Sequence, residues 1–282
     1  MNAATPRRTA SKPQPAQRSD FVESLAKGLE ILSLFAHGDL LGNQQIVERC
    51  GMPRATVSRL TRTLATLGYL RHDAETGKYS MGTRVLGMGA SVQRNMGLIR
   101  AARPFMQTLA EDADLTVTVG TRDRLGIVYL EVVRPVRNRL TINNDAGTVL
   151  PIAQTAIGLA YIVAAPMKER VKLLESLRRR HGAEWSTLRQ SIDRAHDEFR
   201  REGFVTSIQS WSRQINAVAV PMLLSESRRL FSFNCAGPSS ELPPVRLRSE
   251  LGPRLVETVA AIRRQMLAAP LPRLAPPSVH VP

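Results

Sequence analysis

Cysteine is scarce in this chain: Cys50 and Cys235 are the two thiols among 282 residues. Thiols so far apart exclude a disulfide framework and a structural zinc site built from closely spaced cysteines. The five histidines show no metal-ligand spacing. The sequence therefore predicts no metal site and no bound cofactor. Because Cys235 lies in an apolar run without a basic neighbour, a buried inert thiol is favoured over a thiol sensor.

Long hydrophobic runs are also missing. No stretch approaches the roughly 20 apolar residues that span a bilayer, and the basic N-terminus lacks the apolar core of a secretory signal. We therefore expect a cytoplasmic protein without a membrane partner. Hydrophobic residues still make up 43% of the 282 residues, which is enough for two domains with cores of their own.

Acidic residues do not balance the basic ones, and the formal net charge is +15. This charge favours a polyanionic partner. The excess is spread out, however, because residues 1–80 and residues 166–214 each hold 11 basic and 7 acidic side chains. Many basic proteins never bind nucleic acid, so the local charge pattern is more informative than the total.

Between residues 51 and 72 there are four arginines and no Asp or Glu. This stretch overlaps residues 43–67, NQQIVERCGMPRATVSRLTRTLATL, whose pattern predicts two short helices joined by a turn. Gly51 tolerates the positive φ of a tight turn, and Pro53 suits the first turn of the second helix. An arginine-biased helix-turn-helix is typical of a surface that contacts DNA phosphates and base edges.

The second helix of this pair is expected to bury Val57, Leu60, Leu64 and Leu67. Its outer face carries the candidate DNA-binding residues Arg54, Thr56, Ser58, Arg59, Arg62 and Thr63. Arginine forks can pair with phosphate or read guanine. The alternative is a merely solvated helix face.

Two predicted strands, residues 69–72 and 78–80, follow this helix around a turn at 73–77. A helix-turn-helix followed by such a ribbon is a winged helix. Arg71 and Lys78 flank the tip of the wing and are further candidates for contact with the DNA backbone.

The patterns divide the chain into five parts. We expect a disordered basic tail at 1–20, a winged helix-turn-helix domain at 21–82, a connector helix at 83–97, a second domain at 98–268 and a Pro-rich tail at 269–282. The basic tail is either solvated or an arm that contacts DNA.

Order is expected to begin with an amphipathic helix that ends near Gly38, since apolar residues recur at helical spacing at Phe21, Leu25, Leu29, Leu32 and Ala36. Asn43 is expected to cap the next helix.

The second domain combines predicted helices and strands. Helices are predicted at about 99–112, 153–165, 167–180, 186–202 and 245–266. Strands are predicted at 115–121, 126–133, 140–143, 204–209, 215–221 and 229–235. This order predicts an α+β domain with one antiparallel sheet and room for a pocket. Trp185 and Trp211 lie where elements start, and core, interface and pocket all remain open for them.

From about Phe21 to Met266 the chain resembles the IclR family of bacterial transcriptional regulators. The resemblance rests on FVESLAKGLEIL, GMPRATVSRLTRTLATLGYL and KYSMGTRVLGMG in the first half, and on LPIAQTAIGLA, REGF, INAVAVP and FNCAGP in the second. It implies a GAF-like α+β effector-binding domain after the winged helix. It also implies a homodimer or homotetramer on double-stranded operator DNA near catabolic genes, with a small organic acid as effector.

The resemblance also implies an effector pocket. Carried over by motif, its residues are Thr155, Ala156, Ser207, Ala217, Asn234 and Ala236. Many members have a cysteine where Ala217 stands, and serines where Asn234 and Ala236 stand. A pocket that is less polar than in such members favours a larger acid, such as an aromatic one. The alternative is that these six residues simply pack in the core.

Two other functions compete with a ligand-responsive regulator. A nucleic-acid-binding protein without a ligand is one of them. An enzyme with an appended winged helix is the other, but residues 98–266 contain no nucleophile-base group, phosphate-binding glycine loop or paired-carboxylate motif. We therefore expect no enzymatic activity.

Overall fold

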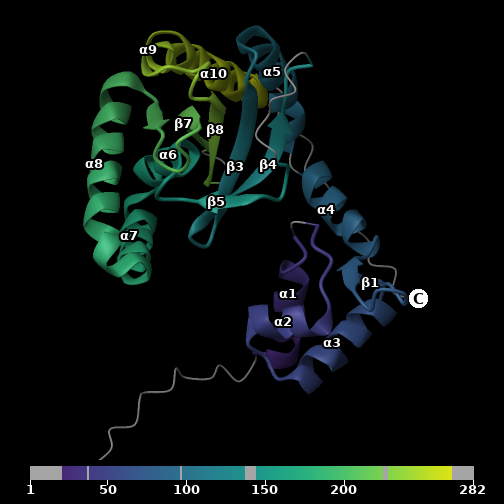
Figure 1. The fold of residues 1–282 in the computed structure, drawn as a ribbon. Helices are drawn as coiled ribbons and strands as arrows, with labels where there is room; N and C mark the ends of the chain where they lie inside the picture. Colours follow the sequence, from purple (N-terminus) through teal and green to yellow (C-terminus); the bar gives the residue numbers. More distant parts are fainter. Residues whose placement is uncertain (1–20, 37, 96, 137–143, 225–227, 269–282) are drawn as a thin grey trace, which may run out of the picture. The chain divides into compact units, whose positions relative to one another are not determined.

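A computed structural model describes residues 21–36, 38–95, 97–136, 144–224 and 228–268. The predicted tails and the predicted strand at 140–143 lie outside these residues. The chain divides into two compact units between Gly87 and Met88 (Figure 1). Among the helices of the described segments, none is long and apolar enough to cross a membrane.

Unit 1 is a helical domain with a two-stranded antiparallel ribbon. Its elements are α1 (Glu23–Ser33), α2 (Asn43–Cys50), α3 (Arg54–Thr66), β1 (Leu70–His72), β2 (Tyr79–Met81) and the start of α4 (Arg84–Asn95). A small core of side chains from all three helices and both strands holds it together.

The first helix differs from the sequence prediction. Its buried residues are Gly28 and Ile31, with Phe35 just beyond its end, whereas Leu25 and Leu29 are 61% and 54% exposed. The spacing predicts the helix, but of the apolar stripe that it marks only Leu32 packs against the core of unit 1, and the rest is exposed. The α-helix also ends at Ser33, before Gly38.

The sequence predicts that Asn43 caps α2, but Asn43 is the first residue of the helix. Instead the Gln45 side chain accepts a hydrogen bond of 3.0 Å from the N–H of Gly42, the capping residue. Asn43 Oδ1 accepts a hydrogen bond of 3.2 Å from the Thr61 hydroxyl on α3. Asn43 therefore joins the two helices of the motif instead of ending one. The turn is confirmed, with Gly51 at φ +66°.

The burial of α3 is close to the expected pattern. Val57 and Leu64 are buried and Leu60 is half-buried, as predicted. Leu67 is 47% exposed, because it lies past the last turn of the helix. Thr61, by contrast, is fully buried, and its single hydroxyl proton is shared between Asn43 Oδ1 and the Val57 carbonyl, which lies 3.0 Å away.

Unit 2 contains one six-stranded antiparallel sheet of order β5-β4-β3-β8-β7-β6. The strands are β3 (Thr116–Asp123), β4 (Gly126–Val133), β5 (Val149–Pro151), β6 (Val205–Ile208), β7 (Ile215–Leu224) and β8 (Arg229–Pro238). The short edge strand β5 is absent from the sequence prediction, because three residues show no recognisable alternation.

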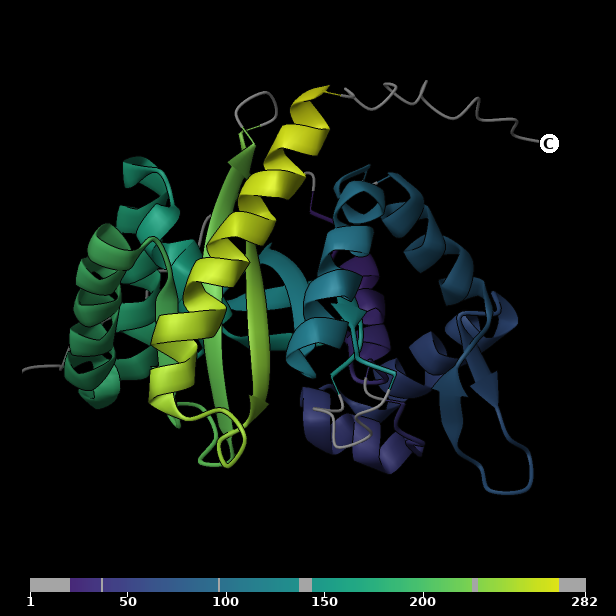
Figure 2. The same ribbon diagram turned by 90° about the horizontal axis from the view of Figure 1, so that it is seen from above.

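Helices cover both faces of the sheet. The helices are α5 (Gly97–Ala113), α6 (Ala156–Ala164), α7 (Met167–His181), α8 (Trp185–Glu202), α9 (Pro244–Arg246) and α10 (Gly252–Ala268). The helix α10 crosses β7 and β8 on one face, while α7 and α8 lie on the other side (Figure 2). Along β8, Phe231, Phe233 and Cys235 pack on the α5–α10 side, and Leu230 and Ala236 on the α6 side.

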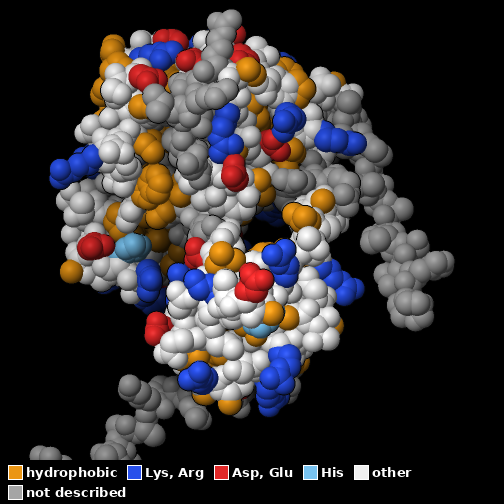
Figure 3. Space-filling view, turned by 45° about the vertical axis from the view of Figure 1, so that its right-hand side comes forward, with side chains coloured by type: hydrophobic (Ala, Val, Ile, Leu, Met, Phe, Trp, Pro, Cys, Tyr) orange, Lys and Arg blue, Asp and Glu red, His pale blue; other side chains and the backbone are white. Residues whose placement is uncertain are grey.

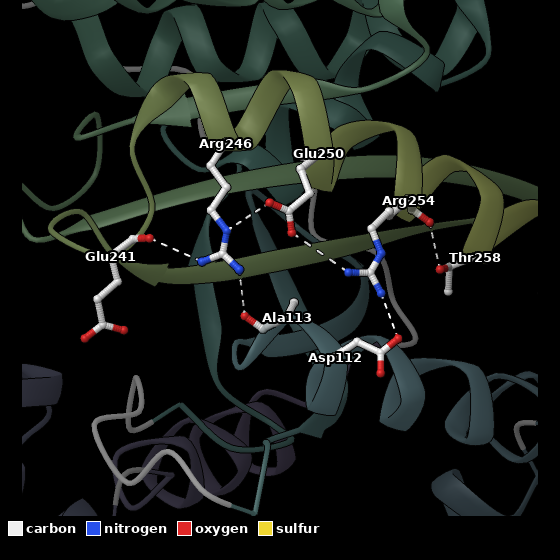
Figure 4. Close-up of polar contacts among 7 residues, drawn as sticks. All are labelled: Asp112, Ala113, Glu241, Arg246, Glu250, Arg254 and Thr258. Atoms are coloured by element: carbon white, nitrogen blue, oxygen red, sulfur yellow. Dashed lines mark hydrogen bonds and ion pairs between the residues drawn. The ribbon is translucent and has the colours of Figure 1, made fainter.

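The last predicted helix is interrupted, because a π-helical turn, Leu247–Leu251, lies between α9 and α10. Around this turn, Arg246 donates to the Ala113 carbonyl at 3.0 Å and Arg254 to Asp112 at 2.8 Å (Figure 4). Glu250 lies between the two arginines, 3.2 Å from Arg246 Nε and 3.9 Å from Arg254 Nη1. These contacts fasten the end of α5 to the last helix.

Candidate functional sites

The outer face of α3 is where the sequence places most of the DNA-binding candidates. Arg54, Arg59, Arg62 and Thr63 are exposed there, and Thr56 and Ser58 are half-buried. None of the ion pairs in the described segments involves the three arginines. Arg59 and Arg62 are three residues apart and therefore neighbours on one face. Lys and Arg side chains also lie at the lower end of unit 1 in Figure 3.

Thr63 differs from the arginines beside it. Its hydroxyl donates a 2.9 Å hydrogen bond to the Arg59 carbonyl, within its own helix. The proton is thus committed, and only the lone pairs of the oxygen face outward.

The two-stranded ribbon of unit 1 has the form of the predicted wing. Asp73 Oδ1 accepts hydrogen bonds from the N–H groups of Thr76 and Glu75, and these bonds lower the pKa of the Asp73 carboxyl. This turn stabilises the tip of the wing. Arg71 and Lys78 flank the turn and are exposed. Tyr79 fixes the wing to the core through a pair of backbone hydrogen bonds with Leu41, of 2.9 and 3.1 Å.

A clasp formed by Gly68, Tyr69, Gly82 and Arg84 joins the end of α3 to the start of α4. Arg84 Nη1 donates to the Leu67 carbonyl at 3.0 Å, and its guanidinium lies 5.8 Å from the centre of the Tyr69 ring. The Gly82 N–H donates to the Tyr69 carbonyl at 2.8 Å. A Cβ at Gly82 would come within 2.2 Å of the Gly68 carbonyl oxygen, so only glycine permits this approach.

In unit 2, all six predicted effector residues line one hollow on the α6 side of the sheet. Seven further residues line it, namely Tyr129, Asn144, Leu150, Ile157, Trp211, Ser212 and Ile215. About 30 Å³ of the hollow is open to the centre of a water-sized sphere. This is room for roughly two waters, at about 10–15 Å³ each.

Buried polar side chains concentrate around this hollow. Of the eight buried polar residues in the described part of the chain, six lie on this face of the sheet or at the start of α6, namely Thr116, Thr118, Thr155, Ser207, Ser232 and Asn234. Burying a polar group is costly unless it finds a partner. Thr155, Ser207 and Asn234 line the hollow, which makes it the candidate ligand site of unit 2.

The start of α6 points polar groups at the hollow. Thr155 caps the helix: its hydroxyl accepts a 3.3 Å hydrogen bond from the Gly158 N–H and donates one of 2.9 Å to the Pro151 carbonyl. The N–H groups of Ala156 and Ile157, in the first turn, have no acceptor within their helix. A helix start of this kind favours an anion.

Tyr129 and Asn234 form the polar part of the hollow at the sheet. Tyr129 on β4 and Asn234 on β8 are 6% and 3% exposed. Burial raises the pKa of the Tyr129 phenol, and the polar side chain of Asn234 offsets this in part. Tyr129 is therefore a neutral phenol at ordinary pH.

Sequence reasoning did not identify Tyr129 or Asn144 as lining residues. Neither residue belongs to a quoted motif, and Tyr129 comes to the same hollow as Asn234 because β4 and β8 both pair with β3. Trp211, for which several roles remained open, is part of the lining and is 39% exposed. The sequence places Trp211 at the start of an element, but Trp211 lies in the loop between β6 and β7.

The thiol of unit 2 and the side chain types that bind metals are further candidates for a second site. Cys235 is fully buried, and burial raises the pKa of its thiol to about 12, as expected of an inert thiol. Within the described segments, no three His, Cys, Asp or Glu side chains are grouped so that they could hold a metal ion.

Comparison with known proteins gives the same division of the chain. Residues 24–74 match the IclR helix-turn-helix domain, and residues 90–264 match the bacterial transcriptional regulator IclR C-terminal domain. The chain is 51% identical over 257 residues to the HTH-type transcriptional regulator TsaQ1/TsaQ2 of Comamonas testosteroni, covering 91% of this chain and 92% of that protein.

Two more relatives extend the comparison. The p-hydroxybenzoate hydroxylase transcriptional activator of Acinetobacter baylyi is 24% identical, covering 86% of this chain and 92% of that protein. A crystal structure of an IclR family transcriptional regulator from Brucella abortus is 40% identical, with a TM-score of 0.77, over 88% of this chain and 94% of that one.

Proposed function

The chain belongs to the IclR family of bacterial transcriptional regulators, and on this premise we propose that a small organic acid in the hollow of unit 2 controls operator binding by unit 1. The regulated genes are catabolic ones, and the chain itself catalyses no reaction. The observation that carries the proposal is that the buried polar side chains Thr155, Ser207 and Asn234 line one hollow between the sheet and the start of α6.

DNA is contacted by α3 and the wing. Arg54, Arg59 and Arg62 supply guanidinium forks that no acidic side chain of the described segments neutralises. Thr56, Ser58 and Thr63 supply short oxygens beside them, and Arg71 and Lys78 approach the backbone from the wing.

The protein acts as a homodimer or homotetramer. Two recognition helices then enter successive major grooves of a pseudo-palindromic operator. The exposed apolar residues Phe21, Leu25 and Leu29 of unit 1 support self-association, since such a stripe is costly to leave in water. The effector changes the relative placement of the two DNA-binding units, which requires that it bind the two arrangements with different affinity.

The effector is larger than the space now open, and an aromatic acid fits the lining best. Ala217 and Ala236 make the lining less polar, while Ile157, Ile215 and Trp211 give it apolar walls. A benzoate-sized acid needs more than the present 30 Å³, so part of the lining must move. Among the lining residues, Trp211 would lose little buried surface by moving, because it is already 39% exposed. The name of the Acinetobacter baylyi relative is compatible with an aromatic acid.

Fluorescence anisotropy with labelled DNA tests the proposal. The full chain should bind the promoter region beside its own gene at least about tenfold more tightly than random DNA at physiological salt. An organic acid found by a thermal-shift screen should change that affinity. Equal affinity for random and promoter DNA would contradict the regulator reading, and a promoter affinity that no acid alters would contradict the effector reading.

A further inference from the structure

Two polar atoms in the lining of the hollow lack partners within the described residues. They are the acceptor Asn234 Oδ1 and the donor Asn144 Nδ2, both buried. A third such atom, Ser232 Oγ, is buried on the same strand as Asn234 but does not line the hollow. An unsatisfied buried polar atom costs free energy, so its retention in a binding hollow points to a partner supplied by the ligand.

The partner of Asn234 must bind beside the Tyr129 phenol, because both side chains line the hollow. Asn234 is 3% exposed, and burial raises the pKa of the Tyr129 phenol and keeps it protonated. An amide and a phenol together present both donor and acceptor capacity. A carboxylate offers acceptors only and cannot satisfy Asn234 Oδ1, whereas a hydroxyl both donates and accepts.

The anionic end of a ligand has a separate place in the same hollow. Ala156 and Ile157 offer first-turn N–H groups at the start of α6, and Asn144 offers an unpartnered N–H₂. These are all donors, and the helix start is favourable to negative charge. The lining thus has a donor-only part and a part with a free acceptor.

We propose that the effector is a hydroxylated acid, and that Asn234 and Tyr129 are the specificity-determining pair that binds its hydroxyl while the α6 start and Asn144 bind its carboxylate. This rests on the proposed function and narrows the ligand class within it. The pair discriminates because a hydroxylated acid supplies a donor to the buried Asn234 Oδ1, whereas an acid without the hydroxyl leaves it unsatisfied. Sites built to hydrogen-bond a hydroxyl reject the analogue that lacks one much more strongly than apolar pockets reject a missing methylene.

Calorimetry with matched pairs of acids tests this. The full-length protein is titrated with benzoate and 4-hydroxybenzoate, and with butanoate and 4-hydroxybutanoate. In at least one pair the hydroxylated acid should bind about tenfold or more tightly than its partner. In Tyr129→Phe and Asn234→Leu that ratio should fall to about twofold or less, mainly because the hydroxylated acid binds more weakly.

Ser232→Ala is the matched control. It removes a buried, unpartnered polar atom from the same face of β8 without touching the lining, so the ratio should stay as in the wild type. Thermal unfolding without ligand establishes that each variant folds. Tyr129→Phe removes one oxygen atom only and keeps the test decisive if Asn234→Leu does not fold.

The outcomes separate this inference from the function on which it rests. Equal binding of both members of each pair, with an effect on promoter affinity, would overturn the inference and leave the acid-effector proposal standing. A preference that survives in both variants would assign the hydroxyl to other residues and would also overturn it. If none of the four acids bound, the inference would also be overturned. Promoter binding is measured separately by anisotropy and tests the proposed function.

Discussion

At the scale of single residues, Arg62 gives a direct test of the outer face of α3. If the Arg62 guanidinium reads a base, Arg62→Ala should weaken promoter binding by about 1–3 kcal/mol. If it contacts a phosphate, the variant should bind all DNA sequences more weakly, and the slope of log affinity against log salt concentration should be smaller by about 1. Anisotropy titrations with promoter and random DNA at several salt concentrations distinguish the two cases.

Arg180→Ala is the charge-matched control for Arg62, since Arg180 is exposed at the end of α7 in unit 2. Its affinity for DNA should stay near that of the wild type. Unchanged binding by Arg62→Ala would place Arg62 on a merely solvated face.

Local patterns predicted single residues of unit 1 well. The arginines of α3 are exposed and Gly51 adopts positive φ, because both depend on near neighbours in sequence. The stripe of α1 was harder, since spacing reveals an apolar face but not which of two apolar faces packs inward. In unit 2, Tyr129 entered the hollow through strand order, which no local pattern contains.

At the scale of secondary structure elements, the clasp at the end of α3 predicts how a signal reaches DNA. Arg84→Ala removes the hydrogen bond to Leu67 and the contact with Tyr69, so unit 1 should lose about 1 kcal/mol of stability. Because α4 then no longer holds the end of α3, the effect of the effector on promoter affinity should shrink. Thermal unfolding and anisotropy with and without effector measure both.

Arg100→Ala is the control for Arg84, since Arg100 is exposed on α5 and has no hydrogen bond or ion pair to the described residues. A full effector response in Arg84→Ala would show that the clasp only stabilises unit 1.

Two helical glycines should respond oppositely to alanine. A Cβ at Gly158 in α6 would lie 2.1 Å from the Ile152 carbonyl oxygen, so Gly158→Ala should destabilise unit 2 by about 1–3 kcal/mol. A Cβ at Gly87 in α4 meets nothing within 4 Å, so Gly87→Ala should stabilise its helix by about 0.5–1 kcal/mol. Denaturant unfolding followed by circular dichroism measures both, and a stable Gly158→Ala would contradict the tight packing of α6.

Elements with strong periodicity were predicted within a few residues, and irregular ones were not. The final helix was expected to be continuous, but the π turn at Leu247–Leu251 interrupts it. An extra residue in a helical turn leaves the apolar period nearly intact, and the contacts that accompany it here involve Asp112 and Ala113, over 130 residues away. Such long-range contacts are not visible in a local pattern.

At the scale of the whole molecule, the apolar stripe of α1 predicts self-association. The double change Leu25→Glu and Leu29→Glu should raise the dissociation constant of the proposed oligomer by at least about tenfold, because it places charge on the exposed apolar surface that self-association would bury. Sedimentation velocity over a range of protein concentrations measures this.

Leu40→Glu is the control for the stripe, since Leu40 is 60% exposed in unit 1 but lies outside α1. It should leave the oligomer intact. If the α1 double variant sedimented like the wild type, self-association would depend on other surfaces.

The position of Trp211 has an optical consequence. The sequence contains two tryptophans, and Trp211 belongs to the lining of the hollow, whereas Trp185 packs against the core around α6, α7 and α8. Replacing Trp185 with phenylalanine leaves a single indole, whose fluorescence emission depends on the polarity and solvent exposure of its surroundings. The protein would then report occupancy of the hollow by its own fluorescence, without a label and without DNA.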